Sequence, residues 1–360
     1  MTPSRTDSAP DGPTPDAPAS LAVVIPARNA ADTIDRCLDA VLDAQPTPDQ
    51  VVLVDDGSTD DTTARAQHRG VAIVQGGTPD APLGPALARN RAVDQLRTDL
   101  VAFVDADCVV APDALTRLAD AMADHPRLGA AFGSYDAHPP GRHLAGQYKN
   151  LLHHVTHQAA PTEVHTFWSG LGIVRREAFQ QIGGFCPRFT QPAIEDIDLG
   201  ARLRASDWSI RVVPDAQCAH LKDWTAPQVW KTDIFQRAIP WTRLIHRTPN
   251  LPPQLNIGRV QQAAALAAVA IIPLLALGLV APVAWIAAAF AIGFAITANA
   301  RLANALLRHG GPRLLAVGLA MHLAYYHYSL ATFAIVTAHE KLAGTPPQPA
   351  PPAATPPSAA

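Results

Sequence analysis

The feature that most limits the fold of this chain is an apolar run that ends in two aspartates. Residues 100–104 (LVAFV) hold no polar side chain, which is typical of a buried strand, and Asp105 and Asp107 follow directly. In α/β sheets, ligands bind outside the carboxyl ends of the strands. Two carboxylates one residue apart can share a divalent cation, and such a cation can also hold a diphosphate. The run therefore predicts a metal-dependent enzyme that acts on a nucleotide diphosphate.

Further strand-like runs alternate with helical patterns between residue 21 and about residue 214. Residues 21–25, 51–54 and 71–74 are short and apolar, and helical segments separate them. Strands separated by helices favour a mostly parallel sheet with helices on both faces. We therefore expect an α/β catalytic domain over residues 21–250.

The composition indicates which partners and which structural sites are not expected in this chain. Only 16% of the 360 residues are charged, which is low for a wholly soluble protein, and the net charge of −3 gives no reason to expect nucleic acid as a partner. The four cysteines form no CxxC pair, so neither a zinc site nor a disulfide framework is expected. Residues 1–20 and the Pro/Ala-rich residues 344–360 are expected to be disordered.

Residues 260–300 contain no Asp, Glu, Lys or Arg. A membrane-spanning helix needs about 20 apolar residues, so this stretch offers two such lengths, with Pro282 between them. Residues 314–338 are a third uncharged stretch, but His322, His327 and three tyrosines make it more polar. It is either a span whose polar face packs on its neighbours or a helix in the membrane interface. We expect a membrane region over residues 258–340 with two or three helices, because such runs exceed ordinary buried core helices.

The flanking arginines predict how these stretches are oriented. Four of them precede the first stretch and three lie between the second and the third, whereas the turn near Pro282 carries no charge. By the positive-inside rule, the catalytic domain and the loop over residues 301–313 are cytoplasmic. The prediction is a multi-pass protein of the cell membrane with a cytoplasmic catalytic domain.

Several motifs, through their order and spacing, resemble those of the family 2 glycosyltransferases with a GT-A fold. They read VVIPARNAADTIDRCLDAVL, VVLVDDGSTDDT, GPALARN, LVAFVDADCVVAPDAL, SGLGIVRREAFQQIGGF and EDIDLGARL. The resemblance covers about residues 21–246. It implies an enzyme that uses a nucleotide-diphosphate sugar as donor and Mg²⁺ or Mn²⁺ as cofactor.

The resemblance implies that the residues at the end of the second strand bind the nucleotide of the donor. Asp55 and Asp56 would accept hydrogen bonds from the base and ribose, with Asp55 the first choice, and Pro26 and Arg28 would line the same pocket. A turn that caps the next helix is the alternative role for the two aspartates, and one does not exclude the other.

Three further residues would contact the donor beyond its nucleoside. Arg89 would meet the phosphates, although a solvated surface arginine is an equally good interpretation. Trp168 and Gly170 would form the floor of the sugar pocket, because an indole stacks on a sugar ring and glycine lets the backbone lie close. A purely structural place in the core remains open for Trp168.

The same resemblance assigns the metal. Asp107 would ligate it directly, and Asp105 would contact it through water or bind the ribose. His220 would be a further ligand or contact the diphosphate, since a neutral imidazole can bind Mn²⁺ or Mg²⁺.

Glu195 and Asp196 match the acidic motif that supplies the base in inverting members. Asp196 is the first choice and Glu195 the second, and Asp198 is expected to be structural. Both candidates lie where a helix begins, so we expect the helix dipole to keep the base ionised at neutral pH.

One departure from the family bears on the product. Processive members carry a QxxRW motif, whereas this chain has a proline, Pro240, immediately before Trp241. The prediction is therefore inverting transfer of a single sugar, from a UDP-sugar in preference to a GDP-sugar, to a lipid-like or membrane-associated acceptor. The alternatives are a soluble or polysaccharide acceptor, or a non-catalytic membrane scaffold that keeps the fold. A nucleotidyltransferase is disfavoured, because the first strand is not followed by a glycine-rich phosphate loop.

Overall fold

The computed structural model describes residues 19–248 and 258–343. The predicted leader lies outside this range except for its last two residues, and the predicted tail lies wholly outside it. Ser20 is held at the start of the domain, since its hydroxyl donates to Asp99 Oδ2 over 2.7 Å.

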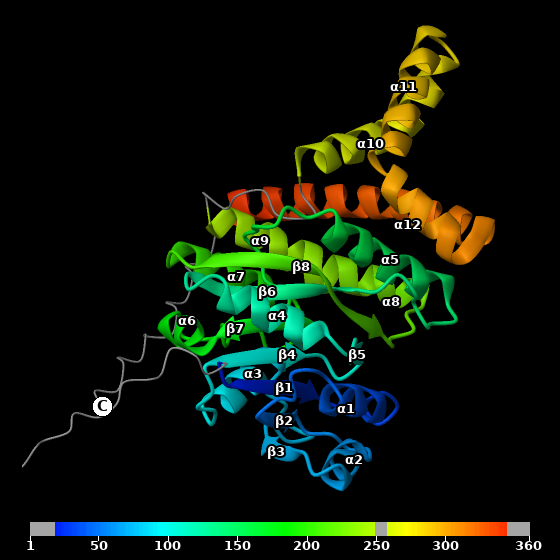
Figure 1. Cartoon of the computed structure of the whole chain (residues 1–360). Helices are drawn as coiled ribbons and strands as arrows, with labels where there is room; N and C mark the ends of the chain where they lie inside the picture. The colour runs from blue at the N-terminus through cyan, green and yellow to red at the C-terminus, as the bar shows by residue number, and fades with distance from the viewer. Residues whose placement is uncertain (1–18, 249–257, 344–360) are drawn as a thin grey trace, which may run out of the picture.

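In the described part of the chain, eight strands form one sheet beside helices on both faces (Figure 1). The strands are β1 (Leu21–Ala27), β2 (Gln50–Asp55), β3 (Ala72–Gln75), β4 (Leu100–Val104), β5 (Cys108–Val110), β6 (Leu128–Tyr135), β7 (Leu171–Arg175) and β8 (Ser209–His220). The helices of the domain are α1 (Ile34–Leu42), α2 (Thr62–His68), α3 (Pro85–Val93), α4 (Ala114–Ala123), α5 (Leu144–Gln158), α6 (Arg176–Gln181), α7 (Glu195–Ala205), α8 (Ala226–Lys231), the π-helix η1 (Thr232–Ala238) and α9 (Ile239–Arg247).

The sheet is mixed, and this refines the prediction of a mostly parallel one. Its order is β3-β2-β1-β4-β7-β6-β8-β5. The strands β3, β2, β1 and β4 are parallel, as their alternation with helices predicts. However, β7 runs antiparallel to both β4 and β6, and β5 runs antiparallel to β8. These antiparallel pairs bring loops from distant parts of the sequence to the carboxyl end of β4.

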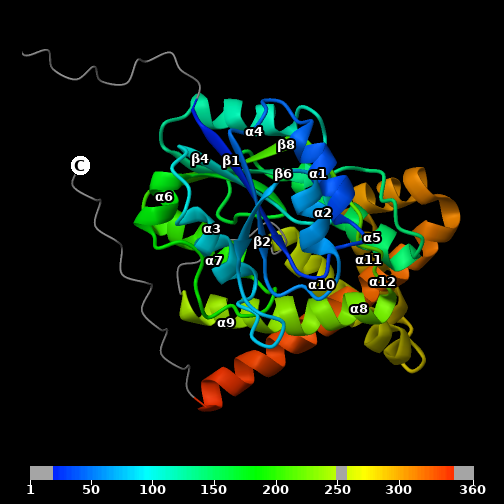
Figure 2. The ribbon, with the colours of Figure 1, turned by 90° about the horizontal axis from the view of Figure 1, so that it is seen from below.

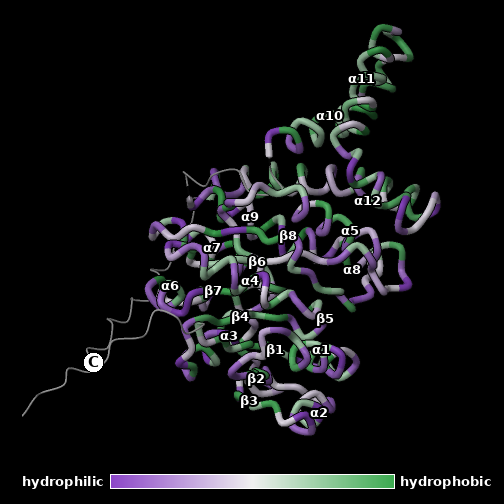
Figure 3. The backbone as a smooth tube through the Cα atoms, viewed as in Figure 1, coloured by the Kyte–Doolittle hydropathy of each residue, from purple (hydrophilic) through white to green (hydrophobic). Residues whose placement is uncertain are grey.

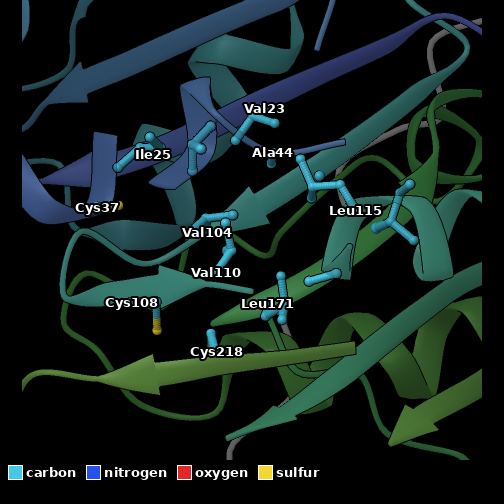
Figure 4. Close-up of a cluster of buried hydrophobic side chains, with 14 of the residues drawn as sticks. Val23, Ile25, Cys37, Ala44, Val104, Cys108, Val110, Leu115, Leu171 and Cys218 are labelled. Atoms are coloured by element: carbon cyan, nitrogen blue, oxygen red, sulfur yellow. The ribbon is translucent and has the colours of Figure 1, made fainter. Parts of the chain in front are cut away.

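Two apolar layers hold the sheet between its helices. One layer packs the sheet against α1 and α4, with Val23, Cys37, Val104 and Leu115 among its buried side chains (Figure 4). The other packs the opposite face against α3, α6 and α7 (Figure 2). Strands that are covered on both faces need apolar side chains on both, which is why β4 reads as an unbroken apolar run.

Three helices follow the domain: α10 (Arg259–Gly278), α11 (Val283–Ala298) and α12 (Ala300–Ala343). Figure 1 shows α10 and α11 projecting away from the sheet, and Figure 3 colours both as largely hydrophobic. Their apolar side chains are unusually open, with Ile272 62% and Phe290 75% exposed. A soluble domain rarely exposes so much contiguous apolar surface.

α12 changes direction at Gly311, whose positive φ of 68° interrupts the helix. Its second half packs along the catalytic domain, where the Tyr328 hydroxyl donates to Asp233 Oδ2 of η1 over 2.7 Å. The Asp233 carboxylate also binds the Lys149 ammonium of α5, with 2.6 Å between Nζ and Oδ1. The third uncharged stretch is thus a helix docked on the domain through its polar face.

The structure supports the expectation of two or three membrane spans only in part. Among the described residues, α10 is the one helix that is long and apolar enough to cross a membrane by itself. α11 and α12 meet the same criterion only as one pair bent by 63°. The docked half of α12 makes polar contacts with α5, η1 and α9.

Candidate active site

The antiparallel pairing of β4 with β7 builds the centre of the site. Val104 lies opposite Leu171, so the Asp105 N–H donates to the Gly170 carbonyl over 3.1 Å. The neighbouring Ser169 N–H donates to Asp196 Oδ2 over 3.4 Å. One short loop therefore joins the end of β4 to the start of α7, and it brings the predicted aspartate pair and the predicted base together.

Arg89 lies beneath this loop and binds two carboxylates. Its side chain is 3% exposed, with Nη2 2.7 Å from Asp105 Oδ1 and Nη1 3.3 Å from Glu195 Oε1. The predicted contact of Arg89 with the donor phosphates does not fit this geometry, because a buried guanidinium held by two carboxylates is not free to meet a ligand. Arg89 instead fixes the positions of Asp105 and Glu195.

The pairing of β5 with β8 brings His220 to Asp107. Cys108 lies opposite His220 in this antiparallel pair, and the Leu221 N–H donates to the Asp107 carbonyl over 2.8 Å. As a result, His220 Nε2 lies 3.5 Å from Asp107 Oδ2. Burial opposes ionisation of Asp107, but the hydrogen bond and charge of His220 outweigh it, so the pKa of this carboxyl is lowered.

His220 is oriented by a residue that sequence reasoning missed. Its Nδ1 lies 2.7 Å from Asn150 Oδ1, while Asn150 Nδ2 lies 3.4 Å from the His220 carbonyl oxygen. This pairing makes Nδ1 a donor to the Asn150 oxygen, so Nε2 is the ring nitrogen that faces Asp107. Nothing in the sequence of α5 indicates this role, since Asn150 and His220 are 70 residues apart.

Asp107 and His220 fit a divalent cation as a pair. Two donor atoms 3.5 Å apart can both reach one ion at about 2.1 Å. Within residues 19–248 and 258–343, no three His, Cys, Asp or Glu side chains gather as a metal site. An ion held here would take its other ligands from phosphate and water, as Mg²⁺ usually does. The Asp105 carboxylate is held by Arg89, so it is less suited to direct ligation.

Asp196 has the environment of a group that can exchange a proton near neutral pH. Burial, followed by the charge of Glu195, raises its pKa to about 7, although Arg89 opposes the shift. Desolvation therefore opposes the helix dipole, which was expected to keep this carboxyl ionised. Glu195 is less available than Asp196, since its oxygens meet Arg89 and the Ala193 N–H.

Asp198, in the next position of the motif, is structural as expected. It is buried, and its carboxylate binds Arg188 at 2.5 Å and Arg202 at 2.8 Å. The three acids of the motif therefore have three different surroundings, because their side chains leave α7 in different directions.

The nucleotide end of the site lies where β1 and β2 finish. Ala27 pairs with Asp55, and the half-buried Pro26 pairs with Val54. The Asp56 carboxylate accepts three backbone N–H groups, from Gly77, Leu83 and Gly84, at 2.7–3.0 Å. It therefore holds the loop between β3 and α3.

Asp55 keeps more capacity to accept hydrogen bonds than Asp56. Its Oδ1 accepts the Ser58 N–H over 3.1 Å, and its Oδ2 has only the Gln75 amide at 3.5 Å. Arg28 is exposed and reaches the Pro79 carbonyl over 3.4 Å, at the edge of the same loop. This geometry agrees with the choice of Asp55 as the donor-binding aspartate.

An aromatic cluster borders the metal pair. Tyr135, the last residue of β6, stacks on His220 with ring centroids 4.5 Å apart and meets the edge of Trp168 at 4.8 Å. Trp168 covers Gly170 so closely that a Cβ there would lie 2.5 Å from its ring. Trp168 is half-buried, so part of its ring packs in the core and part remains open toward the site.

A mixed α/β sheet with an aspartate pair, a histidine and a buried acid near the end of β4 is typical of the GT-A fold. Residues 22–183 match the family described as Glycosyl transferase family 2, and residues 149–223 match a family described as N-terminal domain of galactosyltransferase. Through this domain, the chain is similar to glycosyl transferase family 2.

Relatives and a solved structure agree with this assignment. The succinoglycan biosynthesis protein ExoU of Rhizobium meliloti is 30% identical over 55% of this chain and 60% of its own length. The N-acetylglucosaminyl-diphospho-decaprenol L-rhamnosyltransferase of Mycobacterium tuberculosis is 29% identical over 56% of this chain and 76% of its own length. A mannosyltransferase of Pyrobaculum calidifontis, solved with GDP-Man and Mn²⁺, shares the fold with a TM-score of 0.53 at 21% identity, over 94% of this chain and 90% of its own.

Proposed function

We propose that this chain transfers a single sugar, with inversion, from a nucleotide-diphosphate sugar to a lipid-linked acceptor at the cytoplasmic face of a membrane. The observation that carries the proposal is the loop Ser169–Gly170, which ties the end of β4 to Asp196 through two backbone hydrogen bonds. It sets a proton acceptor beside the strand end where the donor diphosphate is expected.

In this proposal, Asp107 and His220 hold a divalent cation. These two residues would hold Mn²⁺ or Mg²⁺, which would supply positive charge to stabilise the leaving nucleotide diphosphate. Asn150 keeps His220 in the binding tautomer, and Asp55 accepts hydrogen bonds from the nucleoside. Mn²⁺ in the Pyrobaculum calidifontis structure supports this choice of cofactor.

Asp196 is the base in this reaction. It removes the proton of the acceptor hydroxyl while that oxygen attacks the anomeric carbon from the side opposite the nucleotide. Arg89 holds Asp105 and Glu195 as structural carboxylates around it. A base with a pKa of about 7 suits the task, because general bases work best when their pKa lies near the operating pH.

The acceptor class follows from the relatives and from α10 and α11. One relative is described as acting on N-acetylglucosaminyl-diphospho-decaprenol, a lipid-linked diphosphate. The open apolar surface of α10 and α11 would anchor this chain in the bilayer that holds such a lipid. A UDP-sugar remains the favoured donor, with GDP-sugars and rhamnose donors as the alternatives to compare.

The test is a transfer assay with membranes that carry the full chain, a panel of nucleotide-diphosphate sugars and Mn²⁺ or Mg²⁺. We expect nucleotide release and a glycosylated lipid from one donor, lost in Asp107→Ala and Asp196→Asn. Asp124→Asn, an exposed acid beyond α4, is the matched control and keeps activity. Transfer that survives both site substitutions would disprove the assignment, and a retained anomeric configuration would exclude Asp196 as the base.

A further inference from the structure

A cavity of about 390 Å³ lies between α5 and the first half of α12. We call it the basic groove, and its polar lining residues are His154, Gln158, Arg301, Asn304, Arg308 and His309. Small apolar side chains complete the lining, and no acidic residue takes part. The groove is separate from the loop that joins β4 to α7.

The charges of the basic groove lack a counterpart. Arg301 and Arg308 are two turns apart on one face of α12, about 10 Å along the axis. Within the ranges that the structure describes, neither arginine takes part in a salt bridge. His309 meets the edge of His138 at 5.4 Å, which adds a further imidazole. One carboxylate, Asp136, interacts with these histidines. Two arginines against one carboxylate leave a surplus of positive charge, which favours an anion.

The position of the groove indicates where that anion comes from. Arg301 is the first charged residue after the uncharged residues 260–300, and it lies in the first turn of α12, directly after the end of α11. In Figures 1 and 3, α12 leads from α11 back to the domain. If α10 and α11 enter a bilayer, Arg301 lies at the level of the lipid headgroups. Arginines at that level bind lipid phosphates.

The groove also adjoins the active site through a single residue. His154 Nδ1 lies 2.8 Å from the Tyr135 carbonyl oxygen, and the Tyr135 ring stacks on His220 and meets Trp168. His154 of the groove and His220 of the metal pair therefore contact the same residue, Tyr135. A structural phospholipid would have no need of this proximity, whereas an acceptor that carries its sugar next to its phosphate would.

We propose that the basic groove binds the phosphate or diphosphate headgroup of the lipid-linked acceptor. Arg301 and Arg308 bind the phosphate oxygens from α12, and His154 closes the groove on the side of the active site. The acceptor sugar then lies at the end of the groove that faces Tyr135. This inference rests on the proposed function, and it adds the part of the acceptor that the protein recognises.

The test is binding of farnesyl diphosphate to the purified full chain in detergent micelles, measured by titration calorimetry without donor or metal. We expect Arg301→Gln/Arg308→Gln to lower the affinity about tenfold or more, since charge-assisted hydrogen bonds to phosphate are lost. The matched control is Arg259→Gln/Arg313→Gln, which removes the same charge from exposed positions outside the groove. An equal loss in both double variants, or no binding by the unmodified chain, would overturn the proposal.

Two further ligands separate the sources of phosphate. Inorganic diphosphate and phosphatidylglycerol vesicles are each titrated into the unmodified chain and the two double variants. If the groove recognises the acceptor, Arg301→Gln/Arg308→Gln lowers the affinity for farnesyl diphosphate more than the affinity for the vesicles. An equal loss of affinity for both ligands would show that the groove binds phospholipids in general, and it would reject the acceptor role. Binding of a nucleotide sugar with Mn²⁺ is measured separately, because its failure would reject the proposed function and not the groove.

Discussion

Asn150 Oδ1 lies 2.7 Å from Nδ1 of His220. Through this contact, helix α5 orients the imidazole of the candidate metal ligand. The same helix carries Lys149, whose ammonium binds Asp233 beneath α12. Two adjacent residues of α5 therefore have different partners. Asn150 contacts the metal pair, and Lys149 binds Asp233, on which α12 docks.

Asn150→Ala is expected to weaken Mn²⁺ binding about 10- to 100-fold, because residues that orient a metal-binding histidine contribute that much to affinity. Without Asn150, the His220 ring loses the acceptor that holds its proton on Nδ1. Binding is measured by Mn²⁺ titration in the presence of a nucleotide diphosphate. Gln147→Ala removes an amide from the same helix without touching His220 and should bind normally. Unchanged affinity in a folded Asn150→Ala protein would show that His220 is not a ligand.

Arg89→Met should destabilise the protein by about 3 kcal/mol, because it leaves Glu195 and Asp105 without their counter-charge. Urea unfolding measures this loss. Arg97→Met, at an exposed arginine after α3, is the control. Adding Glu195→Gln to Arg89→Met should recover part of the loss, and a purely additive double variant would argue against the pairing.

The raised pKa of Asp196 predicts a pH dependence for activity. The base is ionised above its pKa of about 7, so kcat/KM should rise with pH through that value. Asp196→Asn should lose about 10²- to 10⁴-fold in kcat. A rate that is flat between pH 6 and pH 8 would exclude Asp196 as the base in the free enzyme.

The same shift predicts that Asp196 costs the protein stability. Its folded-state pKa of about 7 lies above the ordinary value of 3.8, so ionisation favours the unfolded state. Relative to the unmodified protein, Asp196→Asn should gain stability as the pH rises from about 4 to 7 and keep that gain above it. Unfolding midpoints at pH 5 and pH 8 measure the difference. A gain of equal size at both values would contradict the assigned shift.

Lys149→Met should destabilise the docking of α12 by about 3–5 kcal/mol, because Asp233 is left buried and unpaired. The double variant Lys149→Met/Asp233→Leu should recover much of this loss, since neither charge is then buried alone. Limited proteolysis within α12 reports the undocking directly. If the helix stays protected in Lys149→Met, the ion pair does not hold it.

Membrane attachment depends on the exposed apolar side chains of α10 and α11. Ile272→Lys/Phe290→Lys should release the chain from membranes, because a lysine near the bilayer centre costs about 3 kcal/mol. The fraction that stays with membranes after an alkaline wash measures attachment. Leu42→Lys, at an exposed apolar residue of α1, should leave it unchanged. Full retention of the double variant would mean that another surface provides the anchor.

Much of the fold follows from local patterns. Apolar runs and helical periodicity indicate β1, β2, β3 and β4 within a residue or two, because these strands are covered on both faces. The antiparallel place of β7 between β4 and β6 was not predictable, since strand pairing depends on contacts between distant segments. For the same reason, the docking of α12 through Asp233 and Lys149 was not predictable from the sequence.

The sequence by itself determined the chemistry of this protein: a strand that ends in Asp105 and Asp107, an acidic helix start at Glu195 and Asp196, and an uncharged stretch suited to a membrane. Those features are local, and adjacent residues carry them. Only the tertiary structure decided which acid is free, because Arg89 reaches Asp105 and Glu195 from a third part of the chain. It also decided that Asn150 orients His220 and that burial raises the pKa of Asp196, since desolvation and hydrogen bonding depend on side chains far apart in the sequence.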